Sequence, residues 1–274
     1  MMKRYCSEKE NRAWKVRGLI IGLALCMAAV FALIGILTPV GESLLGRLSF
    51  LSAAELDSET DATIWGGSAA DLEKYSRELQ KLLERNEEAA DFVEGYPDRE
   101  KYLGEGIDMS GDFVSGQVPL LMQWDRRWGY DAYGDNIIGL AGCGPVCLTM
   151  AYLYFTENTD MTPREMAEFS YDNGYYTSEG TSWSLWTEGA KKLGLCGEEL
   201  SLDENIMKLA LDEGGLIVCS MGPGDFTTTG HFILIRGYDE NGFYVNDPNR
   251  RSNSEKQWKY ETLRGQIRNL WELR

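Results

Sequence analysis

The feature that most constrains this chain is an apolar run near its start. Residues 18–37 read GLIIGLALCMAAVFALIGIL and contain no charged side chain. In a helix that rises about 1.5 Å per residue, such a run measures about 30 Å, the thickness of the hydrocarbon core of a bilayer. We therefore expect a transmembrane helix over residues 18–38. The alternatives are a cleaved signal peptide, whose apolar part is usually shorter, and a buried core helix.

The charge of the residues before this run predicts its orientation. Residues 1–17 hold six Lys or Arg against two Glu, a net charge of +4. Positively charged flanks stay in the cytoplasm. We expect a cytoplasmic tail over residues 1–17, a single-pass anchor in the lipid of the cell membrane, and the remainder of the chain outside. A bacterial cell fits this arrangement.

Composition excludes several classes of function. The net charge of −16 argues against a nucleic-acid partner, since binding to phosphates relies on basic side chains. The single histidine, His231, excludes a histidine-rich metal site, and we expect neither a metal nor an organic cofactor. Six cysteines among 274 residues do not make a disulfide scaffold. Cys196 and Cys219 remain either a disulfide pair or two unpaired core thiols.

The chain between the apolar run and the main domain has two parts. Residues 39–67 are irregular and partly acidic, which is typical of a linker. Residues 68–112 contain a helix that begins near Ser68 and stops at Gly95 and Pro97. Its apolar positions recur at helical spacing: Leu72, Tyr75, Leu79, Leu82, Leu83 and Ala90. We expect this face to pack against the domain that follows.

Residues 113–274 form the main domain, in which helices precede strands. Predicted helices cover residues 146–155, a stretch from Thr162 to about Asp172, residues 182–193 and residues 203–212. Predicted strands cover residues 216–220, 231–236 and 243–246, the last two joined through Asn241-Gly242, a strong hairpin signal. This order indicates an α+β fold with an antiparallel sheet.

A cysteine and the single histidine form the candidate chemistry. Cys143 directly precedes a predicted helix, where free N–H groups and the helix dipole stabilise a thiolate. A nucleophilic thiol needs a base, and His231 supplies the chain's one imidazole. Asp247 follows the partner strand and can orient that imidazole. A loose turn over residues 237–242 would align His231 with Asp247 better than a tight one.

Several motifs carry a resemblance to a known family. They are Gly142-Cys143-Gly144-Pro145, Gly230-His231-Phe232, Val245-Asn246-Asp247-Pro248, Val118-Pro119 through Trp128, Tyr133-Gly134, and residues 86–93 with Tyr96-Pro97. Together they resemble the C39-like group of papain-like cysteine peptidases, which is related to the domains that process bacteriocin leaders. The resemblance covers about residues 70–274. It implies a papain-like fold with an N-terminal helical lobe and an antiparallel sheet.

The resemblance also implies roles for four residues. Cys143 is the nucleophile, His231 the base and Asp247 the orienting residue of a thiol peptidase. Many papain-like enzymes place an oxyanion-binding glutamine six residues before the cysteine, where this chain has Ile137. Gln123 is the best remaining candidate, with the backbone N–H of Cys143 as second donor. The implied substrate is a peptide or protein, cleaved through an acyl-enzyme.

Two other functions stay open. A peptidoglycan amidase or transpeptidase could use the same residues, and a non-catalytic peptide-binding module could share the scaffold. Cys147, one helical turn after Cys143, is expected in the core. Trp183 could line a substrate groove, whereas Trp186 is expected to serve packing. Trp124 and Trp128 are expected in the core or in the wall of a cleft.

Overall fold

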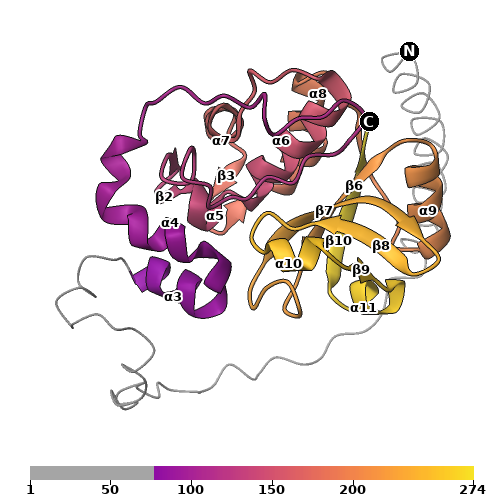
Figure 1. Ribbon diagram of the computed structural model, residues 1–274. Coiled ribbons are helices and arrows are strands. Elements are labelled where there is room, and N and C mark those ends of the chain that lie inside the picture. Colours follow the sequence, from indigo (N-terminus) through magenta and orange to yellow (C-terminus); the bar gives the residue numbers. More distant parts are fainter. Residues whose placement is uncertain (1–76) are drawn as a thin grey trace, which may run out of the picture. The chain divides into compact units, whose positions relative to one another are not determined.

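A computed structural model describes residues 77–274 of the chain (Figure 1). The α and 3-10 (η) helices are α3 (Arg77–Arg85), η1 (Glu87–Ala89), α4 (Ala90–Gly95), η2 (Tyr96–Lys101), α5 (Ile138–Ala141), α6 (Cys143–Thr156), α7 (Pro163–Asp172), η3 (Trp183–Trp186), α8 (Glu188–Lys192), α9 (Glu204–Asp212), α10 (Arg251–Ser254) and α11 (Tyr260–Arg264). The strands are β1 (Ala132–Tyr133), β2 (Asn136–Ile137), β3 (Tyr176–Thr177), β4 (Gly180–Thr181), β5 (Gly197–Glu199), β6 (Leu216–Met221), β7 (His231–Asp239), β8 (Gly242–Asn246), β9 (Gln257–Trp258) and β10 (Ile267–Leu273).

The main sheet is antiparallel and has six strands in the order β5-β10-β6-β7-β8-β9. Its central strands β6 and β7 are apolar on both faces, because each face is covered by helices. Phe232 and Leu234 of β7 join the core on the α6 side, whereas Ile233 and Ile235 join the core that includes α9 and α11. Figure 1 shows α6 and α8 on one side of the sheet and α9 on the other. This mixture of helices and antiparallel sheet agrees with the predicted α+β class.

Helix α6 is the central helix of the α-helical half. Nine of its fourteen residues are buried, which explains why its sequence shows no polar face. It ends at Glu157, whose backbone is left-handed at φ 56°. The helix packs against β7 and α7 and so fixes its first residue, Cys143, beside the end of β7 where His231 lies.

The residues before the main domain form a helical segment that is interrupted at Asn86. Asn86 takes an extended conformation (φ −146°, ψ 94°) and separates α3 from η1 and α4. Leu79, Leu83, Phe92 and Val93 are buried together with Tyr130 of the main domain. The prediction of one continuous helix through Phe92 is therefore wrong, because the chain forms three short helices here.

Predictions for residues 1–76 fall outside the described residues. These include the cytoplasmic tail (1–17), the transmembrane helix (18–38), the linker (39–67) and the first residues of the helical segment. Within residues 77–274, no helix is long and apolar enough to cross a bilayer.

Two predictions inside the main domain are wrong in detail. Residues 182–193 form η3 and α8, separated at Thr187, instead of one helix. The turn between β7 and β8 is tight, with Asp239 paired to Gly242, and a bulge lies between Ile235 and Gly237. The contact between His231 and Asp247 therefore forms without a loose turn between the strands.

Two further cysteines of residues 77–274 are fully buried. Cys147 is fully buried, as predicted, and Cys219 is a buried free thiol. Cys219 is therefore not bonded to Cys196.

Candidate active site

Cys143 is the first residue of α6, and its neighbours have to be small. A Cβ atom on Gly142 would lie 2.5 Å from Ile138 Cγ2, and one on Gly144 would lie 2.5 Å from Thr181 Oγ1. Only glycine fits at either position, so the two glycines allow α5, α6 and β4 to converge on the thiol. Cys143 is a half-buried free thiol at the positive end of the helix dipole.

His231 begins β7, directly after the loop that follows β6. Its Nε2 atom lies 2.7 Å from Oδ1 of Asp247, and both side chains are buried. The imidazole also interacts with the Cys143 side chain, and this interaction favours the charged form of the imidazole. The three residues that the sequence singles out are thus brought together in the order Cys143, His231, Asp247.

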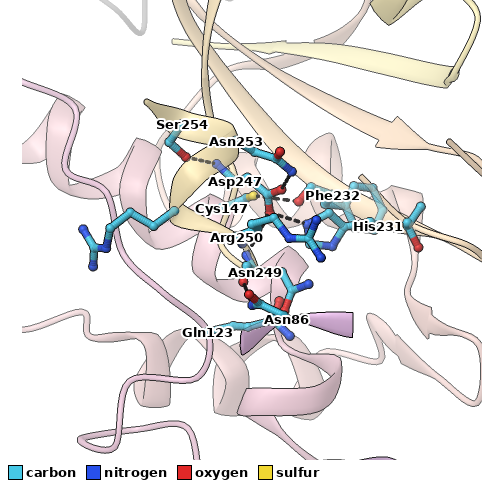
Figure 2. A network of polar contacts seen from close by, with 12 residues as sticks. Asn86, Gln123, Cys147, His231, Phe232, Asp247, Asn249, Arg250, Asn253 and Ser254 are labelled. Carbon is cyan, nitrogen blue, oxygen red and sulfur yellow. Dashed lines mark hydrogen bonds and ion pairs between the residues drawn. The ribbon is translucent and has the colours of Figure 1, made fainter. Parts of the chain in front are cut away.

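Asp247 is held by the turn that follows it (Figure 2). Its Oδ1 accepts backbone N–H bonds from Asn249 at 2.8 Å and Arg250 at 3.3 Å, and its Oδ2 accepts from Asn253 Nδ2 at 2.7 Å. Its own N–H donates to Ser254 Oγ at 2.8 Å. Asn253 is a site residue that sequence reasoning missed. An asparagine six residues after Asp247 carries no recognisable signal, because it reaches the carboxylate only through the fold of α10.

The electrostatics of this cluster favour a charged imidazole. Burial lowers the pKa of His231, but the charge of Asp247, their hydrogen bond and the interaction with Cys143 outweigh burial and raise the pKa to about 10. Burial raises the pKa of Asp247, but the imidazolium and the donors from Asn253 and Asn249 outweigh it and lower the pKa. The pair is therefore an ion pair at neutral pH. By contrast, burial raises the pKa of the Cys147 thiol and keeps it protonated.

Gln123 is buried and is tied to the same region by its backbone. Its N–H donates to the carbonyl of Pro248, the residue after Asp247, at 2.7 Å. Its side-chain Nε2 donates to Gly139 O at 2.9 Å, while its Oε1 has no partner among the described residues. The amide carries two N–H protons, so one remains for a further acceptor.

Other predicted residues have clear structural places. Asn246, beside Asp247, is occupied by bonds from Arg236 and to Pro119, so it does not orient the histidine. Trp128 and Trp186 are buried, as predicted, whereas Trp183 is 47% exposed and packs edge-on against Trp271. Over residues 77–274, no three His, Cys, Asp or Glu side chains are grouped so that they could hold a metal ion.

Comparison with protein families now identifies the domain. Residues 116–274 match the model of the Peptidase_C39 like family, which covers more than half of the chain. The chain belongs to the Peptidase_C39 like family. It therefore contains a peptidase-like domain, and a peptide or protein is the substrate that this family implies.

Two solved structures are similar to this chain at low sequence identity. The peptidase domain of Streptococcus ComA, a bifunctional ABC transporter involved in quorum sensing, is 20% identical, with a TM-score of 0.39, covering 48% of this chain and 90% of that one. A C39-like peptidase from Bacillus anthracis is 15% identical, with a TM-score of 0.39, covering 58% of this chain and 95% of that one. Comparison with curated proteins gives no significant match.

Proposed function

We propose that this member of the Peptidase_C39 like family is an active cysteine peptidase. The observation that carries the proposal is the buried imidazole of His231, which contacts Asp247 at 2.7 Å and interacts with the thiol of Cys143. A thiol at a helix N-terminus, a base and an orienting carboxylate are the parts that nucleophilic catalysis requires. Here all three belong to one cluster, in which His231 and Asp247 are buried and Cys143 is half-buried.

The geometry supports an acyl-transfer mechanism. In the resting site His231 already holds the proton, and the Cys143 sulfur attacks the carbonyl carbon of a peptide bond as a thiolate. The free N–H of Gln123 and the backbone N–H of Cys143 stabilise the oxyanion. His231 then protonates the leaving amine, and the C–N bond breaks. Water, deprotonated by His231, hydrolyses the thioester and restores the thiol.

We also propose that the enzyme is anchored in the cell membrane by residues 18–38 and acts outside the cell. The apolar run and the basic residues before it support this arrangement. Expression of the full chain with cysteine labels placed after the run tests it. Labelling of intact cells by a membrane-impermeant maleimide is expected, and labelling only after lysis would overturn the proposed orientation.

Alkylation of Cys143 followed by a substrate search tests the catalytic proposal. We expect iodoacetamide to modify Cys143 of the purified full chain faster in wild type than in His231→Ala, because the imidazolium of His231 interacts with the thiol. A peptide library that includes peptidoglycan stem peptides then identifies the substrate class. Cys143→Ala should abolish turnover, and Cys147→Ala, which removes a buried thiol one turn away, should keep it.

The outcomes separate the alternatives. Cleavage of stem peptides alone would favour the amidase or transpeptidase. A slowly alkylated Cys143 and no turnover of any peptide would leave a binding module.

A further inference from the structure

Residues 77–103, which we call the clasp, lie before the stretch that matches the family model yet contact the site at two places. Figure 1 shows α3 and α4 beside α5. The inference below rests on the proposed function, because it concerns how the same site is held in its working geometry.

The first contact is with the turn that carries Asp247. Asn86 Nδ2 donates to the carbonyl of Asn249 at 2.5 Å, and Trp124 Nε1 donates to the same oxygen at 2.7 Å. The carbonyl has two lone pairs, so both are used. The N–H of Asn249 donates to the Asp247 carboxylate, and the carbonyl of the same residue accepts from Asn86. Asn86 therefore fixes the residue that positions the carboxylate.

Glu88 contacts the same turn a few residues further along the chain, at Arg251 and Ser252. Its two carboxylate oxygens accept the N–H groups of Arg251 at 2.5 Å and of Ser252 at 3.0 Å, at the start of α10. No side chain of α10's own N-cap, Arg250, serves these groups. Since Asn253 and Ser254 of α10 both bind Asp247, Glu88 stabilises the short helix that supports the carboxylate.

The Asn86 side chain connects its own contact with Asn249 to the contacts that Glu88 makes. Asn86 is 3% exposed, and its Oδ1 accepts the N–H of Glu88 at 3.2 Å while its Nδ2 binds Asn249. The extended backbone at Asn86, which interrupts the predicted helix, turns both ends of the amide toward these partners. An interruption that breaks helical periodicity thus places polar groups on the catalytic turn.

The second contact is with the backbone that holds Gln123. The Phe92 ring lies against Gly139, where a Cβ atom would come within 2.4 Å of Phe92 Cζ, and against Gly129, where it would come within 2.7 Å of Cε2. Gly139 is the residue whose carbonyl accepts the Gln123 amide. Tyr130 OH donates to Phe92 O at 2.7 Å and fixes the ring's own backbone.

We propose that the clasp is part of the catalytic unit, with Asn86 and Glu88 acting as positioning residues for Asp247. The unit that works is then at least residues 77–274, and the stretch from 116 onward is incomplete alone. The clasp touches no reacting atom and acts only through the turn after Asp247 and the backbone at Gly139.

His231 offers a direct readout, because it is the chain's one histidine and gives a single Cε1–H resonance. The experiment titrates this resonance in the full chain, purified in detergent, for wild type, Asn86→Asp, Glu88→Ala and Glu87→Ala. Glu87→Ala is the matched control, since Glu87 is the exposed neighbour of Glu88. Asn86→Asp keeps the acceptor for Glu88, removes the donor to Asn249 and adds a negative charge. That charge by itself favours the imidazolium, so it opposes the expected change.

We expect Glu88→Ala and Asn86→Asp to lower the His231 midpoint by about one pH unit and the rate of Cys143 alkylation at pH 8 about three- to tenfold. Glu87→Ala should match wild type. Glu88 is half-buried, so its variant is expected to stay folded, which circular dichroism and thermal unfolding verify. Wild-type midpoints in both test variants, with folding intact, would overturn the proposal.

Failure of the proposed function looks different. It would appear as a wild-type protein that cleaves no peptide while its histidine midpoint still responds to Glu88→Ala.

Discussion

His231 and Asp247 form a buried ion pair at 2.7 Å although they are not partners in the β7–β8 ladder. Asn246, the last residue of β8, pairs with Leu234, three positions after His231. The chain leaves the sheet at Asp247 and wraps around the carboxylate, so the contact is made by the turn and not by the ladder. The orientation of the imidazole therefore depends on that turn.

Asp247→Asn should separate the charge of the carboxylate from its place in the turn. The amide fills the same volume but cannot hold the imidazolium, so the pKa of His231 should fall and catalysis should drop by about 100-fold. Peptide cleavage and the His231 titration measure both effects. A variant that keeps wild-type turnover would contradict the orienting role.

The same pair makes stability depend on pH in a defined direction. The native pKa of His231 is raised to about 10 from an ordinary 6.5, so the folded state binds more protons between these values. The stabilisation by this group is complete below about pH 6.5 and is lost as pH rises through about 10. Over this interval one proton changes the free energy of unfolding by at most about 1.36 kcal/mol per pH unit.

A variant with uncharged residues at positions 231 and 247 isolates the contribution of His231 to the pH dependence of stability. The double variant His231→Gln/Asp247→Asn removes both charges, whereas the buried Cys147 and Cys219 thiols, whose pKa values are also raised, stay in both proteins. Urea unfolding from pH 7 to 10 should show a steeper loss of stability in wild type. Parallel curves would mean that His231 is not charged in the folded protein.

Much of the fold was predictable because its signals are local. The β7–β8 hairpin, the run of β7, helix α7 and helix α9 with its Asp203 cap depend on neighbouring residues, and they occur close to where they are expected. Strand β10 was missed because Leu270 to Leu273 are all buried and a bulge lies between Ile267 and Asn269. A strand buried on both faces between β5 and β6 shows no alternation to find.

The site follows the same division. Cys143 and His231 could be named as candidates because a glycine-flanked thiol before a helix and a lone histidine are visible in the sequence. Asn253, Asn86 and Glu88 were not, because their importance comes from contacts that span 6 to 164 residues. Gln123 was proposed only by resemblance, and its bond to Gly139 could not be foreseen from spacing.

Gln123→Met tests whether this amide serves the reaction or only the structure. The change keeps the volume and removes the donors, so the oxyanion loses a partner and kcat should fall about 100- to 1,000-fold. The carbonyl of Gly139 also loses its bond, which should cost about 1–3 kcal/mol of stability. Gln117→Met, the same change at an exposed position, is the control. Lost stability with unchanged kcat would make Gln123 purely structural.

Gly139→Ala should reveal how closely the clasp fits the Gln123 backbone. The added methyl would lie 2.4 Å from Phe92 Cζ and 3.0 Å from the carbonyl of Gly129, so the ring or the backbone has to shift. We expect a loss of about 1–3 kcal/mol in the free energy of unfolding. Gly111→Ala, where nothing lies within 4 Å, should be nearly neutral.

A double-mutant cycle with Phe92→Leu assigns the cause of that loss. A smaller side chain makes room for the methyl, so Gly139→Ala should cost less in the Phe92→Leu background, with a coupling of about 0.5–3 kcal/mol. The backbone contact with Gly129 persists, so the relief is partial. The value of kcat should fall together with stability. A shifted Gly139 carbonyl displaces the Gln123 amide from which it accepts a hydrogen bond. If the changes in the free energy of unfolding were additive, steric contact between Phe92 and the added methyl at position 139 would not be the cause of the loss.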